Sequence, residues 1–213
     1  MVDLILISAF FNFVVCSFLT VFLIFKNKRY RYFTLFNSNL VVWSLFYVLS
    51  ISATDYDLAL FYNRICSSCV VIISYLSLLV CADLAHKKIN RYIFILSSLM
   101  ALVLIGLMNT GLMIGRVRPF LGINFVPDVN FAYYLLILYY VVNAFYGHTI
   151  LYKASKNNIR NRFIFFAFVL GFLGGTTNFF PYIGIPIYPF GNFLVGFYAI
   201  LIAYVVLRHR LFD

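Results

Sequence analysis

Few side chains in the long apolar stretches of this sequence could carry out acid–base or nucleophilic chemistry. Within those stretches the chain has one aspartate, Asp83, and one histidine, His148, and it has no glutamate anywhere. An active site needs several such groups brought together. Asp83 and His86 are three residues apart and could share a metal ion, but at the end of an apolar run such a pair more often caps and solvates a helix. We therefore predict no catalytic residue, no metal site, no cofactor and no enzymatic activity.

A pair of cysteines, Cys66 and Cys69, has the spacing of a redox motif. Both lie within an apolar run and on one face of the expected helix, where a buried cysteine behaves as an ordinary small hydrophobic residue. Packing is the favoured interpretation, and thiol exchange is the alternative.

Polar and aromatic residues recur at helical spacing along several apolar stretches, so that each set lies on one face of its helix. Such faces could line a ligand pocket. They could equally hydrogen-bond to neighbouring helices, a contact worth about 0.6 kcal/mol in a membrane. The first interpretation predicts these ligand-binding residues: Asn12, Trp43, Tyr47, Arg64, Ser68, Tyr139, Asn143 and Asn178.

Arg64 differs from the others because a charge within an apolar span is costly and usually has an interior partner or a function. Our hypothesis is that Arg64 closes an outward-facing pocket and pairs with an anionic group of the ligand, with Asp55 or with Asp57. The alternative is that its long side chain extends to the membrane surface from a position near the helix end.

The elements that must position these residues are membrane spans. The chain has 213 residues, of which 64% are hydrophobic and 10% are charged, whereas soluble domains are about 45–50% apolar and 25% charged. A helix needs about 20 apolar residues to cross a bilayer. Apolar runs between charge clusters predict an all-α membrane protein, a single domain over residues 1–213, with spans at about 4–25, 33–53, 58–84, 92–112, 131–151, 163–180 and 190–207.

The net charge of +10 predicts the orientation of these seven spans. Most of the sixteen Lys and Arg residues lie in connections that would share one side, at 26–31, 87–91, 153–162 and 208–210. Positive charge marks the cytoplasmic side, so we expect the N-terminus outside and the C-terminus inside. Because an anionic leaflet also attracts these residues, the charge requires no nucleic acid as a partner.

Two connections have unusual compositions. The segment 109–130 contains three glycines and two prolines among charged residues and predicts a short ordered lid or hairpin over an outward-facing pocket. The segment Pro181–Pro189 has three prolines and a glycine, and is either a stiff connector or part of a binding site. In the sixth span, Gly171, Gly174 and Gly175 allow close helix contact, either static or sliding.

Two other classes of seven-helix protein fit poorly. A retinal protein needs a lysine in its last span, and no lysine follows Lys156. A sugar transporter built from three-helix repeats would have broken helices in both halves, whereas the first proline is Pro119.

The last third of the chain resembles a known family. Asn178, Pro181, Gly184, Pro186, Pro189 and Gly191 are followed by Tyr198, Ala203-Tyr204 and a final Arg210-Leu211-Phe212-Asp213. This pattern is similar to the seven-helix N-terminal sensor region of bacterial histidine kinases, whose last span runs into cytoplasmic signalling domains. The topology resembles that family over the whole chain, and the specific motif covers about 178–213.

The resemblance implies a multi-pass sensor in a bacterial cytoplasmic membrane. Its partners would be the lipid bilayer, an extracellular or membrane-borne ligand, and a cytoplasmic signalling domain or protein. A second copy of the chain, in a homodimer, is a further candidate partner. The chain carries no phosphoacceptor histidine motif and no glycine-rich ATP lid, so we expect an excised sensor region or a stand-alone version that acts through a partner. Signal output is expected at Arg208, Arg210, Leu211, Phe212 and Asp213.

The predicted mechanism is that a cue enters between the outer halves of the helices, under segment 109–130, and shifts the seventh span relative to the sixth. A small transporter or channel is the alternative, and a structural membrane subunit is a third possibility. Transport requires a polar path past Asn143 and His148 to the inner face. Sensing requires a pocket closed below, ending near Tyr139.

Overall fold

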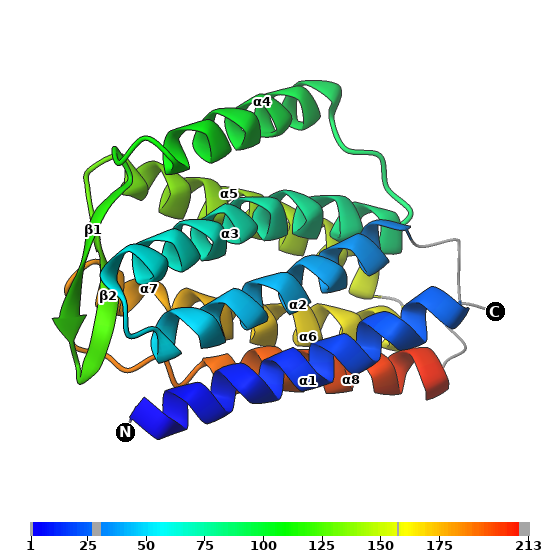
Figure 1. Ribbon diagram of the computed structural model, residues 1–213. Helices are drawn as coiled ribbons and strands as arrows, with labels where there is room; N and C mark the ends of the chain where they lie inside the picture. The colour runs from blue at the N-terminus through cyan, green and yellow to red at the C-terminus, as the bar shows by residue number, and fades with distance from the viewer. Residues whose placement is uncertain (1, 27–30, 157, 209–213) are drawn as a thin grey trace.

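The computed structural model describes residues 2–26, 31–156 and 158–208. These residues form a helical bundle with one β-hairpin (Figure 1). The elements are α1 (Val2–Lys26), α2 (Arg31–Ser52), α3 (Tyr56–Leu84), α4 (Arg91–Met108), β1 (Ile114–Phe120), β2 (Ile123–Val129), α5 (Tyr133–Ser155), α6 (Ile159–Thr176), α7 (Phe179–Tyr182) and α8 (Asn192–Arg208).

The long helices run up and down the bundle in sequence order. The start of α1, the hairpin and the α7–α8 connection lie at one end, here called the hairpin end. The end of α8 and the α3–α4 connection lie at the opposite end (Figure 1). The expectation of a mainly helical membrane protein is therefore confirmed for the described residues.

Short polar residues determine where several helices begin. Asp55 accepts a hydrogen bond from the backbone N–H of Leu58 at the start of α3. Asn90 and Asn158 cap α4 and α6 in the same way. Each cap satisfies one of the backbone donors that a helix start leaves without a partner.

The helix bounds differ from the predicted spans mainly around the loops. Helix α4 ends at Met108 instead of about 112 because the chain turns at Asn109 and Gly111, whose φ is 77°. Helix α6 begins four residues early, at Ile159, and ends at Thr176, where Thr177 caps it before the short helix α7. Turn and cap residues therefore set both ends, Gly111 after α4 and Asn158 before α6.

Six segments of the described chain are long and apolar enough to cross a membrane, with α6 and α7 counted as one segment, Ile159–Tyr182. The seventh predicted span, α8, has 17 residues, and its apolar part is shorter, Asn192–Val205.

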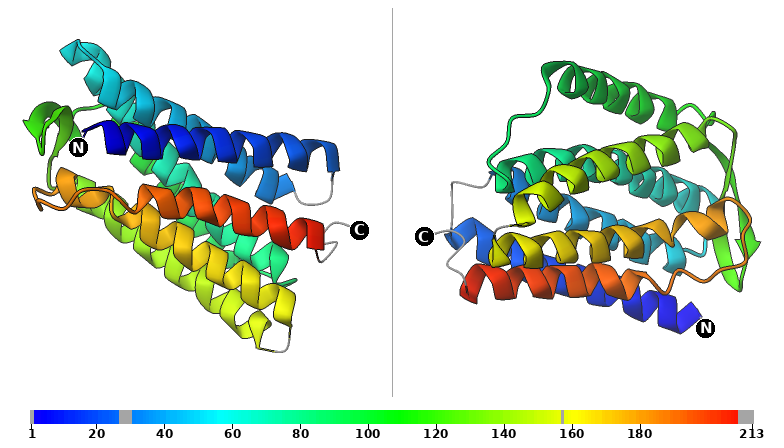
Figure 2. Two further views of the ribbon diagram at one scale, coloured as in Figure 1. Left: turned by 90° about the horizontal axis from the view of Figure 1, so that it is seen from below. Right: turned by 180° about the vertical axis from the view of Figure 1, so that it is seen from behind.

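Helix α3 lies at the centre and α4 at the edge. Helix α3 packs against α2, α4, α5 and the hairpin, and 61% of its most apolar window is buried. The corresponding value for α4 is 22%, and α4 stands apart from the rest of the bundle in the rear view (Figure 2). Apolar residues on the outer face of α4 are therefore available to lipid.

Segment 109–130 forms the predicted hairpin. Strands β1 and β2 are antiparallel and are joined by Leu121 and Gly122, whose φ angles are 55° and 79°. Positive φ at both turn residues is typical of the type I′ turn that suits the twist of two strands. Ile123 and Val126 of this hairpin pack into the buried cluster that contains Trp43 and Tyr47.

Candidate functional site

An elongated internal space, here called the axial cavity, runs along the middle of the bundle. Helices α2, α3, α5, α6, α7 and α8 all contribute to its wall. The residues that define it toward the hairpin end are Trp43, Cys66, Tyr133, Asn178 and Tyr182, and those deeper in the bundle are Phe36, Ser77, His148, Phe168 and Tyr198.

The axial cavity is long but narrow. Along α5 its wall extends from Tyr133 to His148, which corresponds to about 22 Å at 1.5 Å per residue. Its volume is about 70 Å³, whereas an apolar cavity that binds benzene in another protein has about 150 Å³. The helices must therefore separate to admit a molecule of that size.

The hairpin is attached to α3 by Arg64. The Arg64 guanidinium donates from Nε and Nη2 to the Ile114 carbonyl oxygen, at 3.3 Å and 3.0 Å. This partner differs from the predicted ones, because Asp55 is used to cap α3. A hydrogen bond between a charged donor and a backbone carbonyl compensates a charge that a span would otherwise leave without a partner.

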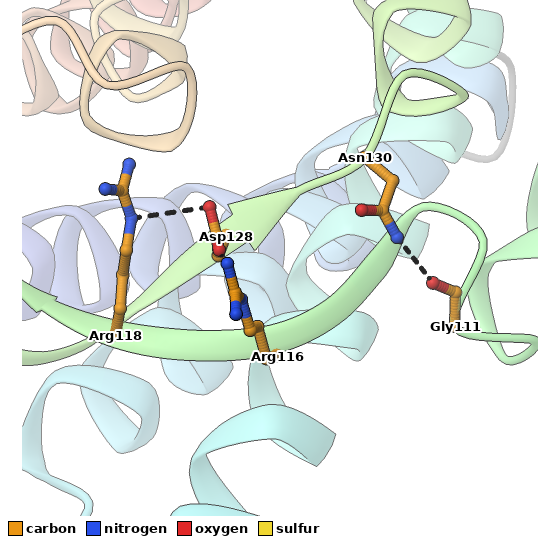
Figure 3. A network of polar contacts seen from close by, with 5 residues as sticks. All are labelled: Gly111, Arg116, Arg118, Asp128 and Asn130. Atoms are coloured by element: carbon orange, nitrogen blue, oxygen red, sulfur yellow. Dashed lines mark hydrogen bonds and ion pairs between the residues drawn. The ribbon is translucent and has the colours of Figure 1, made fainter.

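The other side of the hairpin contacts the α7–α8 connection. The Tyr188 hydroxyl donates to the Leu121 carbonyl at 2.7 Å. The Asp128 carboxylate lies between the Arg116 and Arg118 guanidinium groups, and Asn130 donates to the Gly111 carbonyl at the base of the hairpin (Figure 3). The hairpin thus bridges α3 and the segment that leads into α8.

Helices α6 and α8 are in close contact where they approach the hairpin end. A Cβ atom on Gly174 would overlap the Gly191 carbonyl oxygen and would lie 2.9 Å from the Leu194 Cβ. The Asn178 Nδ2 donates to the Asn192 Oδ1 at 2.7 Å. Both amides are buried, so a polar contact links the end of α6 to the start of α8 inside the protein.

A separate polar network joins α4 to the bundle. The Ser97 hydroxyl donates to the Asn143 Oδ1 at 3.0 Å, and the Tyr139 hydroxyl donates to the Ser97 carbonyl at 3.1 Å. The Asn143 Nδ2 in turn donates to the Ser74 hydroxyl at 3.4 Å. Tyr139 and Asn143 therefore point toward α3 and α4 and are not part of the cavity wall as described.

Three more of the predicted ligand residues, Asn12, Tyr47 and Ser68, are also outside the cavity wall. Asn12 is fully buried on α1 beside Gly196 of α8. Tyr47 stacks on Trp43 with ring centroids 5.4 Å apart, and the Ser68 hydroxyl donates to the Arg64 carbonyl. Of the eight residues, the structure brings Trp43 and Asn178 together at the cavity. Ligand binding by any of them stays a prediction.

The cysteines are buried and unbridged. Cys66 lines the cavity and its thiol donates to the Trp43 carbonyl at 3.7 Å. Burial inside the bundle is compatible with the packing interpretation of the pair. Within residues 2–26, 31–156 and 158–208, no three His, Cys, Asp or Glu side chains are grouped as metal ligands would be.

Several cavity residues had no signal in the sequence. Tyr133, Tyr140, Phe168 and Tyr182 are aromatic residues among many others, since the chain has 17 Tyr and 26 Phe. Asn192, the partner of Asn178, could have been noticed as a lone amide at the start of the last span. Of the predicted output residues, Arg208 is the last residue of α8, and Arg210 to Asp213 lie outside the described residues.

Comparison with known proteins agrees with the resemblance seen at the end of the sequence. No curated protein and no solved structure matches the chain. The family model described as the N-terminal 7TM region of histidine kinase matches residues 5–213. The chain therefore belongs to this family, the multi-pass cell-membrane segments that serve histidine kinases as sensory input regions.

Proposed function

We propose that this sensory region crosses the membrane seven times, with its N-terminus outside, and that the axial cavity receives the cue. Helix α8 has 17 residues, about 25 Å of helix and the lower limit for a span. Lys87 and Lys88 are in the α3–α4 connection and Arg91 begins α4, at the end opposite the hairpin (Figure 1). Positive charge at that end supports a cytoplasmic position for it.

The observation that carries the proposal is that α8 forms part of the cavity wall. Val195 and Tyr198 of α8 line the cavity together with residues of α3, α5 and α6. The same helix begins at the Asn178–Asn192 contact and ends at Arg208. A change in the width of the cavity therefore acts directly on the helix that leads to the C-terminal end.

The size of the cavity provides a reason for movement. Because about 70 Å³ is too small for a benzene-sized molecule, a bound cue must widen the space between α5 and α6 on one side and α8 on the other. A ligand shifts an equilibrium only by its different affinity for the two arrangements. A wider arrangement binds the cue better, so occupancy favours a displaced α8.

The output of this region is the activity of a cytoplasmic kinase, either fused to α8 or contacted by its end. The chain itself performs no chemistry in this proposal. A second copy of the chain and the identity of the kinase are further expectations of the same proposal.

A cross-link between α6 and α8 tests this mechanism. The rings of Phe163 and Tyr204 lie 6.4 Å apart on these two helices and both side chains are exposed. In the full-length protein, kinase activity is measured with each of a panel of small apolar molecules. A short bismaleimide that links Phe163→Cys to Tyr204→Cys should abolish the differences in kinase activity between these compounds. The four native cysteines are buried, which favours reaction at the introduced pair.

The matched control links α5 to α6 and leaves α8 free. Tyr152 and Phe165 have ring centroids 5.5 Å apart, and a bismaleimide across Tyr152→Cys and Phe165→Cys should preserve the response. A full response in the α6–α8 cross-linked protein would contradict the proposed motion.

A small channel or transporter is the second candidate, because the cavity continues past the depth of Tyr139 to His148. The wall there is mainly apolar, although it includes Ser77, His148 and Tyr198. The space beyond is filled by the buried side chains of Phe33, Leu84, Leu151 and Ile164. An apolar, filled passage does not solvate polar solutes. Flux of an ion or sugar through liposomes that contain the protein would favour this candidate over the sensor.

A further inference from the structure

Three residues that line the axial cavity have a buried polar atom without a hydrogen-bond partner among the described residues, namely the Asn178 Oδ1, the His148 Nε2 and the Tyr198 hydroxyl. Of these, the Asn178 Oδ1 belongs to the amide that links α6 to α8. Asn178 is 6% exposed, and its Nδ2 donates to the Asn192 Oδ1 at 2.7 Å and to the Gly175 carbonyl at 3.2 Å. Because a backbone carbonyl can only accept, this second bond fixes which end of the amide is nitrogen. The Asn178 Oδ1 is the end that remains without a hydrogen bond among the described residues.

An unpaired acceptor inside a membrane protein is unfavourable. Burial without a hydrogen bond removes a polar group from water and gives nothing in return. Two hydroxyls of the cavity wall already have other bonds, since Tyr140 donates to the Phe172 carbonyl and Tyr133 is paired with Ser67. A donor that reaches the Asn178 Oδ1 from within the cavity would recover that cost.

The rest of the wall restricts what can carry this donor. The wall has no Asp, Glu, Lys or Arg, and it is formed mainly by aliphatic and aromatic side chains such as Val70, Ile73, Phe172 and Val195. A charged ligand would lose its hydration without gaining a partner of opposite charge. The occupant is therefore neutral.

The shape of the cavity restricts the ligand further. A volume of about 70 Å³ distributed along a wall that runs from Tyr133 to His148 is a thin space. An unbranched chain needs less separation of the helices than a ring does. We infer that the axial cavity binds a slender, neutral, mostly aliphatic molecule with one hydroxyl or similar donor, which hydrogen-bonds to the Asn178 Oδ1. This inference rests on the proposed role of the cavity as the cue site.

The assignment also explains how a small ligand could influence α8. Asn178 is the residue that contacts Asn192 at the start of α8. A ligand that bonds to the Asn178 oxygen changes the position or strength of an amide pair that is shared between α6–α7 and α8. The same side chain, Asn178, would therefore bind the ligand and pass the effect of binding to α8.

The single tryptophan of the chain allows a direct binding experiment. Trp43 lines the cavity and is 6% exposed. A brominated compound that is dissolved in the surrounding lipid therefore has little contact with it. The full chain in lipid nanodiscs is titrated with ω-bromooctanol and, separately, with its methyl ether, which keeps the chain but lacks the donor. Quenching of Trp43 fluorescence measures occupancy.

We expect saturable quenching by the alcohol and a dissociation constant about tenfold higher for the ether, the effect of one hydrogen bond of about 1.4 kcal/mol. In Asn178→Leu the two compounds should bind equally. Asn63→Leu is the matched control, because Asn63 is an equally buried amide on α3 that does not line the cavity. There the tenfold difference should persist.

Equal dissociation constants for the two compounds in the unmodified protein would overturn the inference, as would quenching that rises without saturation. These results need no variant and so do not depend on how well Asn178→Leu folds. If the alcohol binds selectively but kinase output never changes, the ligand assignment stands and the proposed sensing role is contradicted. If selective binding is absent while the α6–α8 cross-link abolishes signalling, only the ligand assignment is contradicted.

Discussion

Replacing Gly174 by alanine should separate α6 from α8 and destabilise the protein. A Cβ at this position would overlap the Gly191 carbonyl oxygen and would also meet the Leu194 Cβ at 2.9 Å and the Val195 nitrogen at 3.1 Å. Two of these three atoms belong to the backbone and cannot rotate away. Overpacking of this kind costs about 1–3 kcal/mol. We expect a loss of about 2 kcal/mol in the free energy of unfolding, measured by denaturation in detergent micelles.

Gly106→Ala provides the matched control for this substitution. Gly106 is also in a helix, α4, but a Cβ there would have no atom within 4 Å. Alanine favours helix over glycine by about 1 kcal/mol, so this variant should be as stable as the unmodified protein or slightly more stable. Equal stability of Gly174→Ala and Gly106→Ala would show that α6 and α8 are not in tight contact. Loss of stability without any change in basal kinase output would argue that the contact is only structural.

Removing the side chain of Arg64 should release the base of the hairpin. Arg64→Ala deletes both hydrogen bonds to the Ile114 carbonyl, and bonds from a charged donor contribute about 1.5–3 kcal/mol. Backbone amides of β1 and β2 should exchange with deuterium faster, and the free energy of unfolding should fall by about 2 kcal/mol. Because the hairpin also contacts Tyr188 near α8, the response of the kinase should weaken as well.

Arg116→Ala is the comparison for this effect. The Arg116 side chain is 74% exposed and pairs with Asp128 on the surface of the same hairpin, and such exposed pairs contribute about 0–1 kcal/mol. Its amide exchange and stability should stay close to those of the unmodified protein. If Arg64→Ala behaves like Arg116→Ala, Arg64 has no role as an attachment point and merely extends to the membrane surface.

The presence of several long apolar helices could be predicted from sequence because crossing a bilayer imposes a length and an apolar composition on each span. The hairpin was predictable from its punctuation, since Gly111 and Gly122 adopt the positive φ values that turns need. The exact residues at which helices end were harder to predict from the sequence. Whether Asn109 ends α4 or continues it depends on packing below the turn, which single residues do not encode.

The candidate site was harder to predict because helical spacing shows which residues share a face but not which neighbour that face meets. Trp43 lines the cavity, whereas Tyr139 and Asn143 face Ser97 of α4. Arg64 was noticed because of its charge, but its partner is a backbone carbonyl, which every residue has. The hydrogen bond between Asn178 and Asn192 could be recognised only from the close contact of α6 and α8, which the sequence does not show.

The central claim is that the width of the axial cavity sets the position of α8. Ala144 of α5 lines the cavity and is 4% exposed, so Ala144→Leu places extra carbon atoms in that space without any ligand. Spin labels at Tyr152 of α5 and Tyr204 of α8, both exposed, report the distance between these helices by pulsed dipolar spectroscopy in the full-length protein.

We expect Ala144→Leu to lengthen this distance by roughly 1–2 Å, the size of helix shifts in known switches. Kinase output should then stay constant and no longer respond to added compounds. A folded Ala144→Leu protein with an unchanged distance and a normal range of output would contradict it.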